Sequence, residues 1–300
     1  MTTTADAPPR ALPAARWQAL AAAHAERADA CTAGHRERRA RGERHAIEDF
    51  LFEYYPTKPA TLRRWHPGAG VGLAPAADGA PAPHARWRWY AVADDGTVAL
   101  DVDAFLADRG DTVRFVTGLL AATLDRPAFT GCFGLHEWAM VYREGDDAHR
   151  HPLPLRLGGA GTDAVVESHR IRCSHFDAFR FFTPDAVARN VLQPTREQQV
   201  ALEQPGCLHA GMDVYKWALK LGPAVPGSLL LDCFALARRI RTLDMQASPY
   251  DVTPYGLPPV AIETVDGKAE YVRRQREHAA EGNALRARLL DVCRALVPTG

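Results

Sequence analysis

The sequence lacks several features that would assign it to a special class of protein. It has no uncharged apolar run of about 18 residues, the length that a membrane-spanning helix needs. Residues 1–13 also lack the continuous apolar segment of a signal peptide. The six cysteines form no Cys-x-x-Cys pair, which argues against a zinc ribbon and a dense disulfide framework. These absences predict a cytoplasmic protein with reduced thiols and no membrane partner.

An excess of charge is absent as well, because 36 Lys and Arg residues balance 36 Asp and Glu residues. The whole molecule therefore has no field that would steer it towards nucleic acid, and any such binding must be local. What is present is ordinary globular composition, 47% hydrophobic and 24% charged. We expect residues 1–13 to be a disordered tail and residues 14–300 to form a single main globular domain. Residues 14–68 could form a separate N-terminal helical piece.

Helical periodicity dominates the chain, whereas strand-like alternation is confined to one region. Residues 86–92 alternate between polar and aromatic or aliphatic side chains, and a turn at residues 94–96 leads into residues 98–102, which predicts a hairpin. The main helical patterns cover residues 14–44, 101–108, 111–124, 212–221, 228–243 and 267–296. We therefore expect an α+β fold that is predominantly α-helical, with helices packed around a small sheet.

Six of the twelve histidines lie between residues 136 and 209. Imidazole carries protons and binds metals near neutral pH, so this clustering favours a site. We expect at least two of four histidines to share a pocket, and two more to be loop residues. The four are His136, His169, His175 and His209, and the two loop residues are His149 and His151.

His136-Glu137 is the first half of the zinc-protease motif His-Glu-x-x-His, but Met140 stands where the second histidine belongs. Glu137 could still act as a general acid or base if its apolar neighbours desolvate it and raise its pKa. The alternative is a carboxylate that is paired with an arginine.

Residues 167–177 (ESHRIRCSHFD) are the most unusual stretch of the chain. In a strand, His169 and His175 would be about 20 Å apart, too far to bind one ion together, and in a helix they would lie on different sides. A grouping of His175 and Asp177 with His209 or Asp213 is therefore more plausible. A buried polar ladder without a ligand is the alternative.

Residues 207–216 are predicted to open a helix after Pro205-Gly206. His209 and Asp213 are four apart and so share one face, and Lys216 is three beyond Asp213. An ordinary Asp–Lys surface pair would give the same spacing.

Nearer the start of the sequence, Arg63, Arg64 and Trp65 could supply stacking and phosphate contacts, although arginine–aromatic stacking inside a fold is commoner.

Six segments carry a resemblance to a known family. They are DFLFEYY (49–55), LRRWHPG (62–68), GCFGLHEWAMVYR (131–143), ESHRIRCSHFDAFRFFTP (167–184), QPGCLHAGMDVYKWA (204–218) and LDMQASPYD (243–251). Together they resemble a bacterial family of similar length whose members are commonly named 3-methyladenine DNA glycosylase. The resemblance implies DNA repair by hydrolysis of the N-glycosidic bond of an alkylated purine, with base flipping, an aromatic pocket and a carboxylate that activates water. The Leu-Pro-Gly-x-Gly motif of the best-known glycosylase fold is incomplete here, because Leu208 replaces its second glycine.

The leading expectation is an N-glycosidic hydrolase that acts on DNA or a purine nucleoside. The candidate catalytic residues are Glu137, His136, His175, Asp177 and Asp213. The candidate substrate-binding residues are Arg63, Arg64, Trp65, Trp138, Arg170, Arg172, Tyr215 and Lys216. One alternative is an oxygenase or hydrolase that acts on a small molecule with a single divalent metal, iron or zinc, held by His169, His175, Asp177 and His209. A non-enzymatic ligand-binding protein is the other alternative.

Overall fold

The structure is a computed structural model, and it describes residues 10–55, 57–144 and 153–297. Residues 1–9 of the expected tail lie outside the described residues, as do His149 and His151. The fold is α+β and predominantly helical, which confirms the predicted fold class. The described α-helices are α1 (Ala14–Ala40), α2 (Phe50–Tyr54), α3 (Pro59–Leu62), α4 (Val102–Leu124), α5 (Leu135–Ala139), α6 (Gly158–Ser168), α7 (Phe176–Phe179), α8 (Pro184–Val187), α9 (Gln199–Leu202), α10 (Leu208–Leu221), α11 (Gly227–Gln246) and α12 (Val265–Leu296). Three short 3-10 helices are η1 (Pro83–Arg86), η2 (Gly222–Ala224) and η3 (Thr253–Tyr255).

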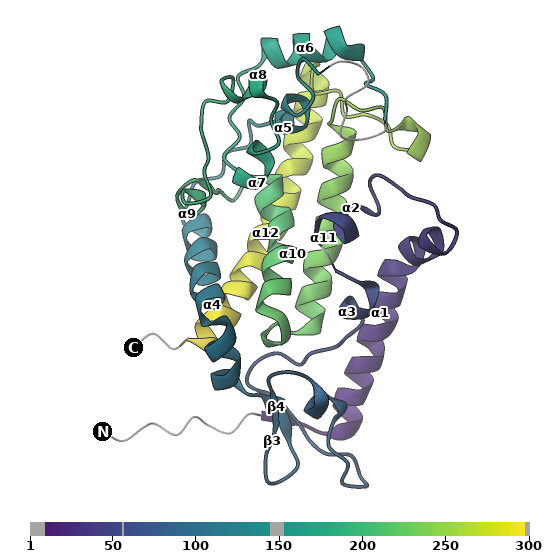
Figure 1. The fold of residues 1–300 in the computed structure, drawn as a ribbon, viewed down its shortest axis with the longest axis vertical. Helices are drawn as coiled ribbons and strands as arrows, with labels where there is room; N and C mark the ends of the chain where they lie inside the picture. Colours follow the sequence, from purple (N-terminus) through teal and green to yellow (C-terminus); the bar gives the residue numbers. More distant parts are fainter. Residues whose placement is uncertain (1–9, 56, 145–152, 298–300) are drawn as a thin grey trace.

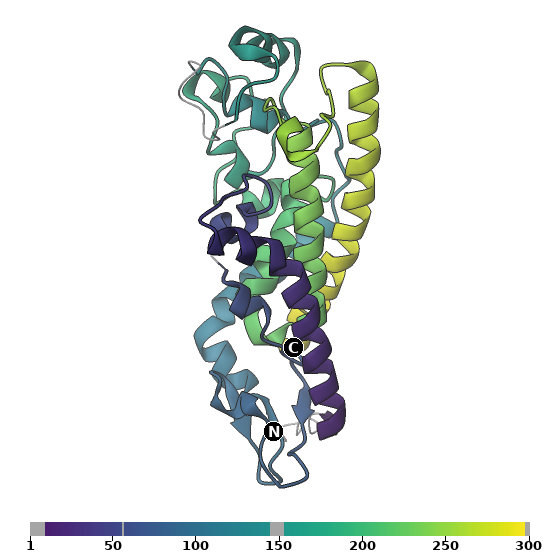
Figure 2. The ribbon, with the colours of Figure 1, turned by 90° about the vertical axis from the view of Figure 1, so that its right-hand side faces the viewer.

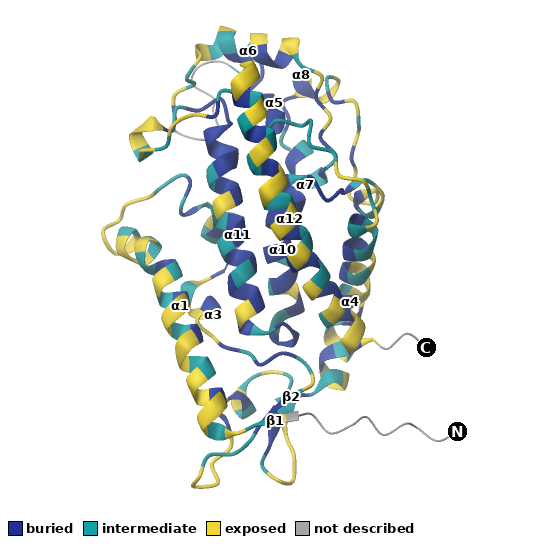
Figure 3. Cartoon of the chain, turned by 180° about the vertical axis from the view of Figure 1, so that it is seen from behind, coloured by how far each residue is buried: buried dark blue, intermediate teal, exposed yellow. Residues whose placement is uncertain are grey.

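Four long helices, α4, α10, α11 and α12, form a bundle with α10 at its centre (Figure 1). α10 is buried on nearly all sides, as expected of a helix whose apolar residues are not confined to one stripe. α12 is solvent-exposed along its outer face, as Figure 3 shows, and packs its inner face on α4, α10 and α11. The helices thus make one continuous core, in which His209 and Asp213 of α10 are removed from water, whereas Lys220 in its last turn is exposed.

A four-stranded sheet lies at one end of this bundle, next to the start of α1 (Figures 1 and 2). Its strands are β1 (Arg10–Leu12), β2 (Val71–Leu73), β3 (Tyr90–Val92) and β4 (Val98–Leu100), in the order β1-β2-β4-β3. The predicted hairpin is confirmed, since β3 and β4 pair antiparallel with Val92 opposite Val98. β1 pairs parallel to β2, so the prediction of a disordered tail was wrong for residues 10–12.

Two other boundaries differ from the predictions. Residues 101–124 form one helix rather than two, because Asp101 caps α4 by accepting a hydrogen bond from the Ala104 amide at 2.9 Å, and Gly110 continues the helix. Residues 169–175 form neither a strand nor a helix, apart from an isolated bridge between Ile171 and Asn190. Among the described residues, no helix combines the length and the apolar character needed to cross a membrane.

Candidate functional site

The short helix α5 and the last turn of α11 lie towards the end of the bundle that is away from the sheet (Figure 1). Polar residues of these two helices and of the first turn of α10 are buried. α10 enters the bundle at this end and carries His209 in its first turn, whereas α11 leaves it here and carries Asp244 in its last turn. α5 brings His136 and Glu137 against both helices. It begins after Gly134, whose φ of +70° lies in the left-handed region that favours glycine.

Three of these side chains have the spacing of metal ligands. One ligand atom from each of His136, His209 and Asp244 lies within 4.8 Å of the other two. His136 Nε2 and Asp244 Oδ1 approach to 3.0 Å, yet neither atom takes part in a hydrogen bond of normal geometry. All three residues are at most 9% exposed. The two atoms form an ion pair with each other. A divalent cation bound between them would replace the shared proton and use the same nitrogen and oxygen as ligands.

Arg241 holds the Asp244 carboxylate in place by a hydrogen bond. Its Nη1 donates hydrogen bonds to Asp244 Oδ2 at 3.1 Å and to Glu137 Oε1 at 2.9 Å. Burial raises the pKa of Glu137, and the Arg241 guanidinium opposes only part of that shift. Both features considered from the sequence are therefore present: the Glu137 carboxylate is desolvated, with a raised pKa, and it is also paired with an arginine.

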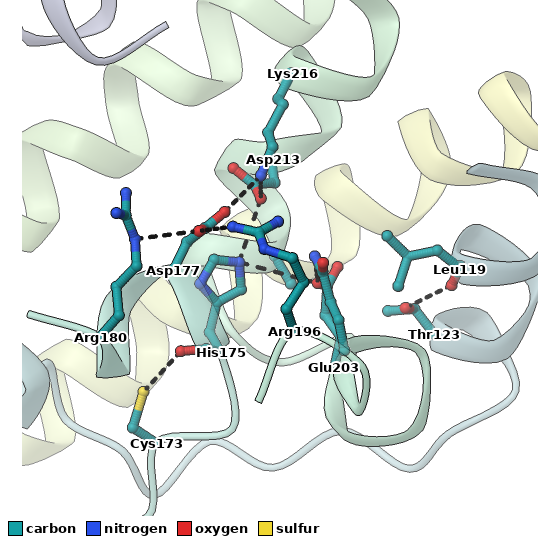
Figure 4. A network of polar contacts seen from close by, with 12 residues as sticks. Leu119, Thr123, Cys173, His175, Asp177, Arg180, Arg196, Glu203, Asp213 and Lys216 are labelled. Atoms are coloured by element: carbon teal, nitrogen blue, oxygen red, sulfur yellow. Dashed lines mark hydrogen bonds and ion pairs between the residues drawn. The ribbon is translucent and has the colours of Figure 1, made fainter. Parts of the chain in front are cut away.

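A second polar group begins at His175, which directly precedes α7 (Figure 4). His175 Nε2 lies 3.3 Å from Asp213 Oδ2, and the Lys216 ammonium donates to Asp213 at 2.9 Å and to Asp177 at 2.7 Å. These distances bring His175, Asp177 and Asp213 together, with Lys216 between the two carboxylates, although the ligand-spaced group of the described residues does not include them. Tyr55 Oη donates a further hydrogen bond to Asp213 Oδ1 at 2.6 Å. The Asp213 carboxylate is thus saturated with donors.

His209 connects the two groups. Its ring centroid lies 4.3 Å from that of His136 and 5.4 Å from that of His175. Although burial disfavours the imidazolium, the Asp244 carboxylate raises the pKa of His136 and the Asp213 carboxylate raises that of His175. Burial and the neighbouring His136 hold the pKa of His209 well below its usual value, so this ring is neutral and able to act as a ligand.

Several residues predicted to bind a metal or substrate lie elsewhere. His169 contacts the Val165 carbonyl oxygen at 2.6 Å at the end of α6, and within the described part of the chain the ligand-spaced group contains neither it, His175 nor Asp177. Of the predicted metal set, only His209 therefore belongs to the ligand-spaced group. An irregular segment brings His175 into the core and leaves His169 at a helix end.

The predicted stacking residues are packed into the protein interior. Trp138 is fully buried and donates to the Ala247 carbonyl at 2.8 Å, so it presents no face to a base. Trp65 belongs to the core cluster beneath the sheet, and Tyr215 is fully buried with its ring edge-to-face to Tyr55. Lys216 is held by two carboxylates, as described above.

The predicted phosphate-binding arginines are exposed on separate parts of the surface. Arg63 pairs with Asp29 of α1 at 3.0 Å, and Arg64 lies 6.0 Å from the Trp87 ring, both near the sheet. Arg170 and Arg172 follow α6, and Arg172 lies over the Phe129 ring at 4.8 Å. These side chains are therefore not gathered around the buried group.

Asp244 and Arg241 were missed from the sequence, although a signal for each was present. Asp244 is four residues after Ile240, on the same buried stripe of α11 as Phe234 and Ala237. A carboxylate in the last turn of a helix is opposed by the helix dipole and so requires a local partner. Arg241 was placed off the buried stripe, yet it is only 1% exposed.

In comparisons with known proteins, no family model, no curated protein and no solved structure matched this chain. The resemblance to the 3-methyladenine DNA glycosylase family therefore stays a prediction, and the site is interpreted from its geometry alone.

Proposed function

We propose that the protein is a metal-dependent enzyme that holds one divalent cation with His136, His209 and Asp244 and acts on a small organic molecule. The observation that carries this proposal is the convergence of three buried ligand atoms within 4.8 Å, two of which, on His136 and Asp244, lie 3.0 Å apart. Ligands about 2.0–2.2 Å from a shared ion lie roughly 3–4 Å from each other, so the spacing fits after a small adjustment.

The donor set narrows the choice of metal. Two imidazoles and one carboxylate are the ligands of zinc hydrolases and of non-haem iron(II) oxygenases, and both leave coordination positions open. A cation bound here would supply Lewis acidity or, in the case of iron, activation of oxygen. The same three ligands would thus serve a hydrolase if the metal is zinc and an oxygenase if the metal is iron.

The chain's own residues orient and tune this site. Arg241 holds Asp244 by Oδ2, which leaves Oδ1 directed at His136. Such partners of the ligands typically change metal affinity 10- to 100-fold when mutated. Glu137, one residue from His136, is buried with a raised pKa, so it is suited to receive or return a proton during the reaction.

N-glycosidic hydrolysis is a reaction that such a site could also perform with a metal-activated water. No observation on the substrate favours it, because the predicted arginines and Trp65 lie away from the buried group. Trp138 lies beside that group but is fully buried, with its indole bonded to the Ala247 carbonyl. Release of base from alkylated DNA or from a purine nucleoside by the metal-loaded protein would support that substrate class.

Metal analysis of protein purified without a histidine tag tests the proposal. We expect about one equivalent of iron or zinc per chain, and less than about a tenth of an equivalent in Asp244→Asn and His209→Ala, because each variant removes one ligand. Oxygen consumption by the iron form and ester or amide hydrolysis by the zinc form then separate the two activities.

His84→Gln is the matched control for these variants. His84 is 3% exposed and His136 is 5% exposed, so both are buried histidines, but His84 lies beneath the sheet. Circular dichroism shows whether each variant is folded. The proposal fails if the folded wild-type protein binds no divalent metal, or if the ligand variants bind as much metal as His84→Gln does.

A further inference from the structure

A cavity of about 560 Å³ lies near the sheet, lined by the first half of α1, the start of α11 and residues of β1 and β2. This volume is in the range of small-molecule binding sites. Gly227 begins α11 and Asp244 lies in its last turn, so about 26 Å of helix separates them at a rise of 1.5 Å per residue. The cavity is therefore distinct from the candidate metal site.

One part of the cavity lining is apolar. Leu20 of α1, Val71 of β2 and Leu231 of α11 line it, together with Trp65. These side chains come from elements far apart in the sequence, and they offer aliphatic and aromatic surface on several sides of the cavity. Such a lining suits the apolar body of a small organic molecule.

The other part of the lining carries positive charge. Arg16 and Arg27 of α1 line the cavity, and none of the described residues that line it is acidic. Arg27 pairs with Asp232 at 2.9 Å, but Asp232 also pairs with Arg288 at 3.0 Å, so two guanidinium groups share one carboxylate. An excess of positive charge remains, and it favours an anion.

The first turn of α11 adds to this positive potential. Pro226 and Ser228 line the cavity on either side of Gly227. Pro226, which precedes the helix, makes no side-chain cap, and the Ser228 amide forms no hydrogen bond with another described residue. A free amide at the start of a helix of 20 residues, together with the helix dipole, attracts negative charge.

A buried polar atom without a partner lies beside this helix start. His24 is 6% exposed, and its Nδ1 has no hydrogen-bond partner among the described residues, whereas its Nε2 lies 2.8 Å from the Leu62 carbonyl oxygen. A Cβ atom on Gly227 would lie 2.9 Å from this Nδ1 and 2.8 Å from the neighbouring Cε1, so the Nδ1 edge of the ring faces the first residue of α11. The absence of a side chain at Gly227 permits this close approach.

We propose that this cavity binds a small organic acid. The carboxylate or phosphate of the ligand lies at the first turn of α11, near Arg16 and Arg27, and its apolar body packs against the aliphatic lining. The negative charge favours a proton on His24 Nδ1, which then donates a hydrogen bond to the acid group. The inference does not depend on the proposed metal, because the two sites lie near opposite ends of α11.

Isothermal titration calorimetry on the full chain tests the preference for an acid with an apolar body. 4-Phenylbutanoate and 4-phenylbutanamide have the same body, but only the first is charged, and acetate has the charge without the body. We expect the carboxylate to bind roughly tenfold more tightly than the amide, and acetate to show no binding below about 10 mM.

Two neighbouring alanines of α1 provide a matched pair of variants. Ala22 and Ala23 are both exposed, but only Ala23 lines the cavity. Ala23→Glu places a carboxylate one helical turn before Arg27, so it should weaken 4-phenylbutanoate roughly tenfold and leave the amide within about twofold. Ala22→Glu adds the same charge on another face of the helix and should leave both ligands within about twofold.

The outcomes also locate the bound acid. Asp244→Asn should bind 4-phenylbutanoate as the wild-type protein does, whereas loss of binding in this variant would place the acid on the metal and overturn the inference. Equal affinities for the acid in Ala23→Glu and Ala22→Glu would overturn it as well. So would the absence of binding of both 4-phenylbutanoate and phenyl phosphate up to about 10 mM. Failure of the metal proposal alone would leave these results unchanged.

Discussion

The protein contains two groups of three buried or half-buried histidines, one near the sheet and one at the opposite end of the bundle. In the first group, His24 contacts the Leu62 carbonyl, His84 the Trp65 carbonyl and His66 the Tyr90 hydroxyl, each at 2.8–2.9 Å. In the second group, which contains His136, His175 and His209, His136 lies 3.0 Å from an Asp244 oxygen and His175 lies 3.3 Å from an Asp213 oxygen.

Because of this difference in partners, the pKa values of two histidines at the candidate site are raised, although burial alone would lower them. Burial lowers the pKa of all three histidines near the sheet, that of His66 to about 3. At the candidate site, burial has the same tendency, but neighbouring carboxylates raise the pKa values of His136 and His175. Clustering of histidines is therefore compatible with simple packing, and it is the buried carboxylates beside the histidines, with ligand atoms at the spacing of a shared ion, that indicate a site.

The largest effect should come from removing the Arg241 guanidinium, which forms ion pairs with both Glu137 and Asp244. Arg241→Met leaves Glu137 and Asp244 buried without their common partner, and we expect a loss of about 3–5 kcal/mol in the free energy of unfolding. Urea denaturation in the presence of a chelator measures it. Arg288→Met, which removes an exposed ion pair with Asp232, should cost no more than about 1 kcal/mol. Equal losses in the two variants would contradict the importance of the buried network.

The second largest effect should be the stabilisation of the protein by a bound metal. This stabilisation should depend on the histidines at the candidate site and not on those near the sheet. At a Zn²⁺ concentration 100 times its dissociation constant, binding should stabilise the wild-type protein by about 2.7 kcal/mol. His136→Gln should abolish this gain, and His84→Gln should keep it, because only His136 belongs to the ligand group. Thermal denaturation with and without Zn²⁺ measures the difference. Loss of the gain in His84→Gln as well would remove the distinction between the groups.

The helical parts of this fold could be predicted because their apolar residues repeat with helical spacing. Residues 212–221 and 228–243 were predicted within a few residues of α10 and α11. Residues 169–175 could not be predicted in this way, because irregular backbone follows from tertiary contacts such as those of Asn190, whose side chain bonds both backbone groups of Cys173.

The candidate site was predictable in part. His209 and Asp213 were paired correctly because helical spacing alone fixes their common face. Asp244 was missed because it is distant in sequence from the other polar residues, and only the packing of α11 against α10 and α5 brings it to His136. Sequence reasoning finds ligands on one element more readily than ligands shared between three.

The histidines near the sheet should make the protein sensitive to acid. An unfolded histidine binds a proton below pH 6.5, whereas folded His66 stays neutral down to about pH 3, so stability is present above pH 6.5 and is lost as the pH falls below it. Between pH 7 and pH 5 this residue alone should cost about 2 kcal/mol. His66→Phe keeps the ring and removes the titration, so its free energy of unfolding should fall by about that much less over the same range. Urea denaturation at both pH values measures this, and an unchanged pH dependence would exclude His66 as the cause.

The smallest effect concerns the arginine–aromatic turn at residues 63–65, which the sequence analysis considered for stacking and phosphate contacts. Arg63 is 58% exposed and pairs with Asp29, which is 36% exposed, so Arg63→Gln should change the free energy of unfolding by less than about 1 kcal/mol. Because the turn lies at the sheet end, away from the metal ligands, metal content and turnover of any substrate found for the metal-loaded protein should also stay the same. If Arg63→Gln instead lowered turnover on alkylated DNA while leaving the folded protein and its metal intact, the turn would bind phosphate. The two ends of the molecule would then act on one large substrate, and the turn could no longer be regarded as packing alone.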